Sequence, residues 1–284
     1  MTISTEKCSK KLEATMALIK KINHHDVEGV RFGKYNLADN STAVMYKLGD
    51  TIIDSGPPNQ WKEVKAYLSE TGFKKVALTH HHEDHSGNSA RISNYFNTPV
   101  YIHESGIEPI KKGFSLKLYQ KILFGKPKKF TPERMLEEIT TGDGHTLKPI
   151  PTPGHSFDHV CFLEPEKKWL FTGDLFLANR PKLFRADEDL SGEIESLRTI
   201  LKYDFKTIFC AHKGVVKDGY EQLQFKLGYF LDLVTQVNEM HLKGSTAREI
   251  THRLFGKKDL VGIVSFNHIC YENLVEECLK VKNL

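Results

Sequence analysis

One short segment of the chain is unusually rich in side chains that bind metal ions. Directly after the apolar run at residues 76–79, the sequence reads His80-His81-His82-Glu83-Asp84-His85. The apolar run predicts a short buried strand, so the histidines would lie at its C-terminal end. Because side chains alternate along an extended chain, we expect His80 and His82 on one side and His81 on the other. Two imidazoles on one side are ligands typical of zinc, so the segment predicts a metal site.

The composition is that of an ordinary folded protein. Of the 284 residues, 39% are hydrophobic and 27% are charged, which excludes disordered, collagen-like and coiled-coil chains. The 40 basic and 36 acidic residues leave a formal charge of +4, a weak basis for binding nucleic acid. The five cysteines form no CxxC pair and are odd in number, which disfavours a disulfide framework and favours a cytoplasmic location. Apolar runs stay well below membrane-spanning length, so we expect no membrane partner.

The hydrophobic pattern predicts an α/β protein in which strands and helices alternate. The first 20 or so residues predict a short leading helix. Residues 104–140 interrupt the alternation, because apolar residues recur at every fourth position from Ile110 to Ile122 among seven lysines. This spacing predicts a basic amphipathic helical insertion.

The last part of the chain has a helical pattern from Tyr220 onward. We therefore expect a catalytic domain over residues 1–219, with the insertion inside it, and a helical C-terminal region over residues 220–284.

Further segments make the pattern specific enough to indicate a family. Together with the histidine-rich segment they match, in order, the five motifs of the metallo-β-lactamase superfamily, which the chain resembles over about residues 30–220. The matching residues outside the segment are Asp54 at the end of a predicted strand, His155 in Pro151-Thr-Pro-Gly-His155-Ser-Phe-Asp-His159, Asp174 in Phe171-Thr-Gly-Asp174, and His212 in Cys210-Ala-His212. The resemblance implies a four-layer αβ/βα sandwich that carries a helical insertion and a helical C-terminal tail.

The resemblance also implies which residues bind metal. One divalent ion would be held by His80, His82 and His155, a second by Asp84, His85 and His212, and Asp174 would bridge the two. Asp54 would lie behind the ligands, and His159 is a candidate for a similar supporting hydrogen bond. Zinc is the favoured metal, with iron and manganese as alternatives that these ligand types do not separate.

Two adjacent divalent ions would explain how such a chain acts as an enzyme. They repel each other unless an anionic group such as the Asp174 carboxylate lies between them. Water bound to them is acidic enough to supply a nucleophile near neutral pH, and one ion would polarise the attacked carbonyl or phosphoryl oxygen. Asp84 has a second expected role, as a catalytic group that carries a proton to the leaving group.

Departures from particular branches of the superfamily narrow the expected activity. His85 stands where one class of β-lactamases has arginine, and His82 stands where flavin-linked diiron oxygen reductases have glutamate. Leu177 stands where acyl-homoserine lactonases usually have tyrosine. We therefore expect a zinc-dependent hydrolase whose partner is a small-molecule ester, thioester or lactone.

Three other functions stay open. A reduced winged-helix-like element at residues 245–280 would suit an endoribonuclease or phosphodiesterase of the β-lactamase-like group, but the low net charge disfavours nucleic acid. A mononuclear iron persulfide dioxygenase is less expected, because the Gly-Arg-Thr-Asp stretch of that group is missing after Asp174. A non-catalytic metal-binding module is least expected, since structural zinc sites are closed and often rich in cysteine. The lysines of the insertion are expected to form a solvated surface, and the sequence leaves the oligomeric state open.

Overall fold

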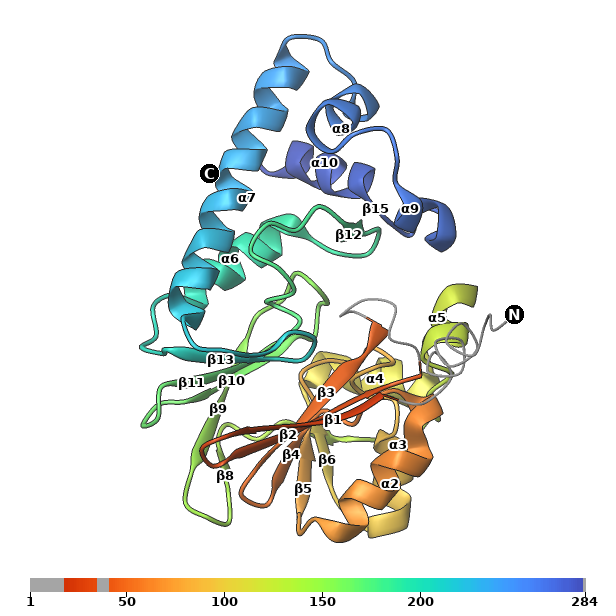
Figure 1. The fold of residues 1–284 in the computed structure, drawn as a ribbon, viewed down its shortest axis with the longest axis vertical. Helices are drawn as coiled ribbons and strands as arrows, with labels where there is room; N and C mark the ends of the chain where they lie inside the picture. The colour runs from red at the N-terminus through yellow and green to blue at the C-terminus, as the bar shows by residue number, and fades with distance from the viewer. Residues whose placement is uncertain (1–17, 35–40, 283–284) are drawn as a thin grey trace, which may run out of the picture. The chain divides into compact units, whose positions relative to one another are not determined.

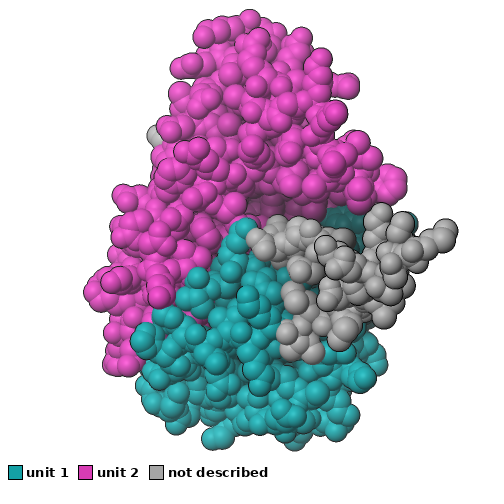
Figure 2. Space-filling view, viewed as in Figure 1, with its two compact units in different colours: residues 1–148, 210–215 teal, residues 149–209, 216–284 magenta. Residues whose placement is uncertain are grey.

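The computed structural model describes residues 18–34 and 41–282, and the expected leading helix lies largely outside these ranges. Where the description begins, Leu18–His24 forms a strand, β1, rather than the end of a helix. The chain forms two compact units (Figure 2). Unit 1 comprises residues 1–148 and 210–215, and unit 2 comprises residues 149–209 and 216–284. The domain boundary expected after residue 219 stays a prediction.

Unit 1 is built on a seven-stranded sheet with the strand order β1 to β7 (Figure 1). Its first four strands are antiparallel neighbours, namely β1, β2 (Val27–Gly33), β3 (Ala43–Leu48) and β4 (Thr51–Ile53). Three strands then add in parallel, namely β5 (Lys75–Ala77), β6 (Val100–Ile102) and β7 (Glu133–Arg134). Parallel neighbours require crossover connections, so the C-terminal ends of β4, β5 and β6 meet at one edge of the sheet. The histidine-rich segment follows β5 at this edge.

The crossover helices bury their apolar side chains against this sheet. After the short 3₁₀ helix η2 (Pro58–Gln60), α2 (Trp61–Glu70) buries Val64 and Leu68, which lie one turn apart. α3 (Ser89–Phe96) buries Ile92, and α4 (Glu104–Lys112) buries Ile110. These side chains share one apolar core with residues of the strands, such as Val76. The core holds rigid the sheet edge that carries the histidines.

The expected helical insertion is present, but it consists of two helices rather than one continuous amphipathic helix. α4 ends at Lys112, and a second helix, α5, runs from Leu118 to Leu123. Gly113 separates the two with a positive φ of 78°, and a Cβ there would lie 2.6 Å from Cε of Lys129. Ile110 is buried, but Leu118 and Ile122 are 64% and 55% exposed. The four-residue spacing therefore does not mark a single buried face.

Unit 2 combines strands with the C-terminal helices. The strands β13 (Thr207–Cys210), β11 (Trp169–Gly173), β10 (Val160–Glu164) and β9 (Thr146–Pro151) are neighbours in this order. Unit 2 also holds a two-stranded ribbon of β12 (Phe184–Arg185) and β15 (Ile269–Cys270). By contrast, β8 (Ile139–Thr140), which pairs with β9, belongs to the residues of unit 1, and β14 (Gly214–Val216) lies where the chain passes from unit 1 to unit 2. The helices are α6 (Leu190–Ile200), α7 (Gly219–Leu242), α8 (Ala247–Phe255), α9 (Leu260–Ser265) and α10 (Tyr271–Lys280). The expected helical C-terminal region is thus present.

Within the described ranges, no helix combines the length and apolar character that crossing a membrane requires.

A buried ion pair joins two helices of unit 2. Lys226 of α7 is 2% exposed, and its Nζ lies 2.5 Å from Oε1 of Glu193 on α6. The same ammonium group donates a hydrogen bond of 2.7 Å to the carbonyl oxygen of Leu175, in the turn after β11. Burial raises the pKa of Glu193, and the Lys226 ammonium group opposes this rise. Because a buried charge is tolerated only with a partner, the pair determines how α6, α7 and this turn pack together.

Replacing Lys226 with methionine should destabilise the protein strongly. The variant leaves Glu193 buried without its cation, and we expect the free energy of unfolding to fall by about 3–5 kcal/mol. The double variant Lys226→Met/Glu193→Leu removes both charges and should recover most of this loss. Urea unfolding followed by circular dichroism measures the change, with Lys202→Met on the exposed surface as the control. A single variant as stable as this control would contradict the prediction.

Candidate metal centre

The histidine-rich segment forms a compact loop between β5 and α3. Most of its residues adopt bends and turns, so the expected extended chain is absent, yet Nε2 of His80 and Nδ1 of His82 still lie 2.9 Å apart. The loop is tied to the segment after β4, because the carbonyl oxygen of His85 accepts hydrogen bonds from both the backbone N–H and the hydroxyl of Ser55, at 2.6 and 2.7 Å. The loop therefore holds its side chains in fixed positions at the sheet edge.

Asp54 orients His85 from behind. It follows β4 with a left-handed φ of 63°, and its Oδ1 accepts a hydrogen bond of 2.8 Å from the backbone N–H of Thr79. Its Oδ2 lies 2.8 Å from Nδ1 of His85. A carboxylate only accepts, so Nδ1 of His85 carries the hydrogen and Nε2 keeps the lone pair that can bind a metal ion. Asp54 thus lies directly behind His85, which is one of the predicted ligands.

His212 is oriented in the same way by a backbone carbonyl. It follows β13, and its Nδ1 donates a hydrogen bond of 2.7 Å to the carbonyl oxygen of Thr42. Arg31 holds both partners, because its Nη1 donates to the carbonyl oxygen of His212 at 2.5 Å and to Oγ1 of Thr42 at 2.9 Å. No sequence motif marks Arg31 or Thr42, since their contacts with His212 join segments 170 or more residues apart. Nε2 of His212 is left to bind metal.

Asp84 completes a cluster with these two histidines. Its Oδ1 lies 3.8 Å from Nε2 of His85, and its Oδ2 lies 3.6 Å from Nε2 of His212. All three residues are buried, and one ligand atom from each lies within 4.8 Å of the others. A tetrahedral ion with bonds of about 2.1 Å places its ligands about 3.4 Å apart, so small movements would close these donors around one ion. The two imidazoles and one carboxylate fit a divalent metal.

His80 and His82 lie beside this cluster. Nε2 of His80 is 2.9 Å from Nδ1 of His82, and the ring centroids of His80 and His85 are 4.1 Å apart. Both side chains are nearly inaccessible to water, at 0% and 4% exposure. Unit 1 therefore brings together five of the predicted ligands, and all five are buried.

The other two predicted ligands, His155 and Asp174, belong to unit 2. Nε2 of His155 lies 3.2 Å from Oδ2 of Asp174, and its Nδ1 lies 2.6 Å from Oε1 of Glu188. Burial by itself would lower the pKa of His155, but the carboxylates of Asp174 and Glu188 outweigh it and raise the pKa. Glu188 was not expected, because it stands 33 residues after His155 and outside the matched motifs.

His159 supports the turn that presents Asp174. Its Nε2 accepts a hydrogen bond of 3.1 Å from the backbone N–H of Asp174. Nδ1 of His159 therefore carries the hydrogen, and it lies 2.8 Å from Oγ1 of Thr152. Both ring nitrogens of His159 are occupied by these contacts. The geometry therefore suits His159 to orienting Asp174 rather than to binding a metal ion itself.

Comparison with known proteins gives consistent results. The sequence profile described as the metallo-beta-lactamase superfamily matches residues 38–212. An atrochrysone carboxyl ACP thioesterase of Pseudocercospora fijiensis is 30% identical over 206 residues, which is 68% of this chain and 53% of that protein. A thioesterase of the same name from Aspergillus fumigatus is 29% identical over 61% of this chain and 50% of its own length. The lactamase-like protein nscB of Trichophyton verrucosum is 29% identical over 64% of this chain and 58% of its length. The chain thus spans about half the length of these curated relatives.

Solved structures show the same fold. A metallo-beta-lactamase family protein of Thermus thermophilus has a TM-score of 0.59 and 18% identity, and the match covers 93% of this chain and 90% of that one. A beta-lactamase domain protein of Burkholderia ambifaria has a TM-score of 0.66 and 16% identity, with coverage of 93% and 86%. At these identities the likeness concerns the fold.

Removing the carboxylate behind His85 should weaken metal binding without removing a ligand. In Asp54→Ala the His85 ring loses the acceptor that keeps hydrogen on Nδ1, so we expect metal affinity to fall about 10–100-fold. Competition with a chromogenic chelator measures the affinity of the full chain for zinc. Asp232→Ala, at an exposed position on α7, is the matched control. Equal affinities in the two variants would show that Asp54 does not orient the ligand.

Proposed function

The chain belongs to the metallo-β-lactamase superfamily, and we propose that it is a metal-dependent hydrolase that cleaves a thioester. The observation that carries the proposal is the buried cluster of Asp84, His85 and His212. Two independent acceptors turn the Nε2 atoms of both histidines toward one carboxylate, which is the arrangement a divalent ion requires. Relatives named carboxyl ACP thioesterases support a thioester as the bond that is cleaved.

The proposed ligand set contains seven residues and two ions. Asp84, His85 and His212 would hold one ion, and His80, His82 and His155 the other, with Asp174 between them. The assignment of His155 and Asp174 to this centre rests on the order of the sequence motifs along the chain. Zinc is the proposed metal because imidazole and carboxylate ligands suit it, with iron and manganese as alternatives. Bound ions of this kind would supply Lewis acidity and a nucleophile from water near neutral pH.

The protein's own residues would position these ions and move one proton. In thioester hydrolysis, the oxygen of water adds to the acyl carbon, the C–S bond breaks, and the sulfur leaves as a thiol. We assign the proton transfer to Asp84, which at 8% is the most exposed of the five ligands in unit 1. Its two oxygens face different histidines, so the carboxylate can keep one contact while the other changes.

The remaining side chains of the centre would keep the ligands in place. Asp54 and the Thr42 carbonyl hold the imidazoles of unit 1, and His159 and Glu188 hold Asp174 and His155 in unit 2. Such supporting contacts determine ligand orientation and basicity. We propose that the substrate is a small acyl group and that the protein acts in the cytoplasm.

Cleavage of a panel of substrates tests the proposal. We expect the metal-loaded chain to hydrolyse an acyl-N-acetylcysteamine thioester, and to lose at least about 100-fold of this activity in His212→Ala or after chelation, because a ligand or the ion is missing. Added zinc, manganese or iron should restore the chelated enzyme. His241→Ala, an exposed histidine at the end of α7, is the matched control.

Parallel assays use an oxygen ester, a lactone, a phosphodiester and short single-stranded RNA. Cleavage of RNA or the phosphodiester without turnover of the thioester would replace our proposal with the nuclease alternative. Thioester turnover that persists unchanged in His212→Ala would exclude the metal cluster as its source.

A further inference from the structure

The insertion of unit 1 concentrates positive charge that has no partner within the described part of the protein. Between residues 109 and 132 there are seven lysines and no aspartate or glutamate. Lys111 and Lys112 pair with Glu108, with N–O distances of 3.4 and 2.9 Å. The other five are at least partly exposed and have no ion pair with a carboxylate of the described residues, namely Lys117, Lys121, Lys126, Lys128 and Lys129. A chain with a net charge of only +4 therefore carries a local surface of one sign.

Two large apolar side chains lie within this basic surface. Leu118 and Ile122 are one turn apart on α5 and are 64% and 55% exposed. Lys117 and Lys121 precede them by one position each, so a basic row runs beside an apolar row along the helix. Exposed apolar side chains of this size that are grouped and rimmed by charge mark interaction surfaces. We call residues 114–129, which include α5, the basic face.

α5 is capped at its start and tied to another part of unit 1 at its end, so its outer face is preformed. At its start, Oε1 of Gln120 accepts a hydrogen bond of 2.7 Å from the backbone N–H of Lys117. At its end, Asn59 donates from its backbone N–H to the carbonyl oxygen of Phe124 and from its side chain to that of Leu123, at 2.9 and 2.7 Å. A helix this short is unstable alone and persists only through such contacts.

The inner side of the basic face directly contacts residues 80–86 of the histidine-rich loop, here called the ligand loop. Nε2 of the buried Gln120 donates a hydrogen bond of 2.8 Å to Oε1 of Glu83, which stands between His82 and Asp84. The ring of Phe114 packs edge to face on the ring of His81, with centroids 5.1 Å apart. Whatever binds the basic face is therefore one side chain away from the proposed ligands.

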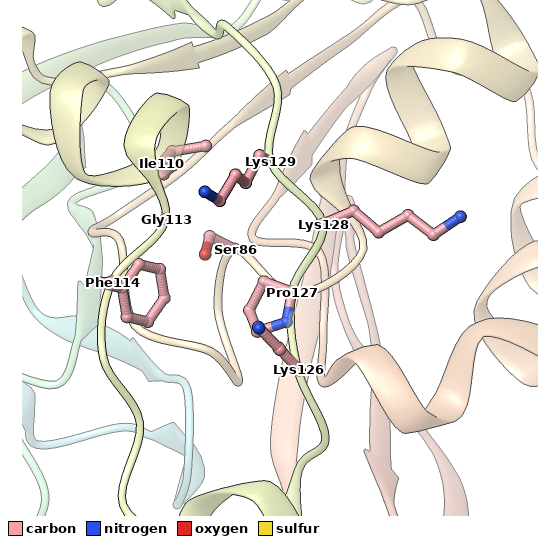
Figure 3. A pocket seen from close by; sticks show the side chains of 8 residues that line it. All are labelled: Ser86, Ile110, Gly113, Phe114, Lys126, Pro127, Lys128 and Lys129. Carbon is pink, nitrogen blue, oxygen red and sulfur yellow. The ribbon is translucent and has the colours of Figure 1, made fainter.

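A small pocket opens where the basic face meets the ligand loop (Figure 3). It is lined by Ser86 of the loop, by Phe114, and by Lys126 and Lys129, among others. In Figure 3 the side chain of Lys129 reaches across the pocket between Ile110 and Ser86, whereas Lys128 points away from it. The basic face thus combines outward lysines with one that is directed toward the loop.

We propose that the basic face is the docking surface for an acidic carrier protein that delivers the acyl group as a thioester. This inference rests on the proposed function and names the form in which the substrate arrives. The charge is complementary to an acidic protein, and the apolar row would receive apolar side chains of its binding helix. A small anion would engage only the lysines nearest to it and would leave Leu118 and Ile122 unused. A membrane surface would need a larger apolar area than two side chains on a six-residue helix provide.

Two double variants separate the parts of the surface. Lys117→Glu/Lys121→Glu reverses the basic row, and Leu118→Ser/Ile122→Ser removes the apolar row. Lys217→Glu/Lys243→Glu makes the same charge change at positions of unit 2 that are at least partly exposed, and is the control. None of these residues contacts a proposed ligand, so each variant should keep the metal affinity of the parent chain.

The kinetic test compares one acyl group in two forms, on the phosphopantetheine thiol of an acidic acyl carrier protein and on N-acetylcysteamine. For the carrier-bound form, we expect both variants to raise KM roughly tenfold at low salt while kcat stays unchanged, since each weakens association with the carrier and neither changes a proposed ligand. For N-acetylcysteamine, kcat and KM should match the control. A carrier KM that stays at the parental value in both variants would overturn the docking surface. An equal rise in KM for the acyl-coenzyme A thioester would point instead to a site for small anions.

A binding measurement keeps the docking proposal separate from the catalytic one. Biolayer interferometry with the unloaded carrier protein, at low and high salt, should show salt-sensitive binding to the parent and the control but not to the two variants. Binding without hydrolysis of either thioester would refute the proposed function and leave the docking surface standing. No binding by the parent chain would overturn the docking surface itself. Variant-sensitive binding to anionic lipid vesicles, without carrier binding, would assign the face to a membrane.

Discussion

Two fixed hydrogen-bond acceptors, the Asp54 carboxylate and the Thr42 carbonyl, determine what the centre of unit 1 can do. A neutral imidazole can carry its hydrogen on Nδ1 or on Nε2, and only the tautomer with hydrogen on Nδ1 leaves a lone pair on Nε2. Asp54 and Thr42 select this tautomer for His85 and His212. The parallel pairing of β4, β5 and β6 brings their C-terminal ends to one edge of the sheet. Asp54, which follows β4, therefore lies beside the loop that follows β5. The chemistry of the site is therefore a consequence of strand pairing.

The local part of this arrangement could be predicted from the sequence, and the long-range part could not. The position of the ligand loop after a buried strand, and the aspartate ending another, follow from short patterns. Arg31, Thr42 and Glu188 could not be found, because their contacts join segments far apart in the chain and no motif marks them. β1 was missed for a related reason. The helical spacing that predicted a leading helix runs only as far as Ile19, and the strand state of β1 depends on its pairing with β2.

In the insertion, the backbone conformation of one residue, Gly113, interrupts the helix that the apolar spacing predicts. Apolar residues at every fourth position predict one buried helical face, but Gly113 adopts a positive φ against the Lys129 side chain and ends α4. α5 then begins in a new orientation, with Gln120 turned inward and Leu118 turned out. The same spacing that predicts a core therefore yields an exposed apolar row. A solvated surface of lysines, which is the expectation from the sequence, explains the charges but not the exposed Leu118 and Ile122. The proposed docking role explains both.

The ligands and the insertion contribute different things to selectivity. Divalent ions on imidazole and carboxylate can activate water against thioesters, esters or phosphodiesters alike, so the ligand set by itself does not choose the substrate. Selection must come from side chains outside it, and in unit 1 α5 contacts the ligand loop directly through Gln120 and Glu83. The residues of α5 that face inward differ from those that face outward. Its outer face can therefore change during evolution to suit a new partner, while the inner hydrogen bond keeps the ligand loop in place.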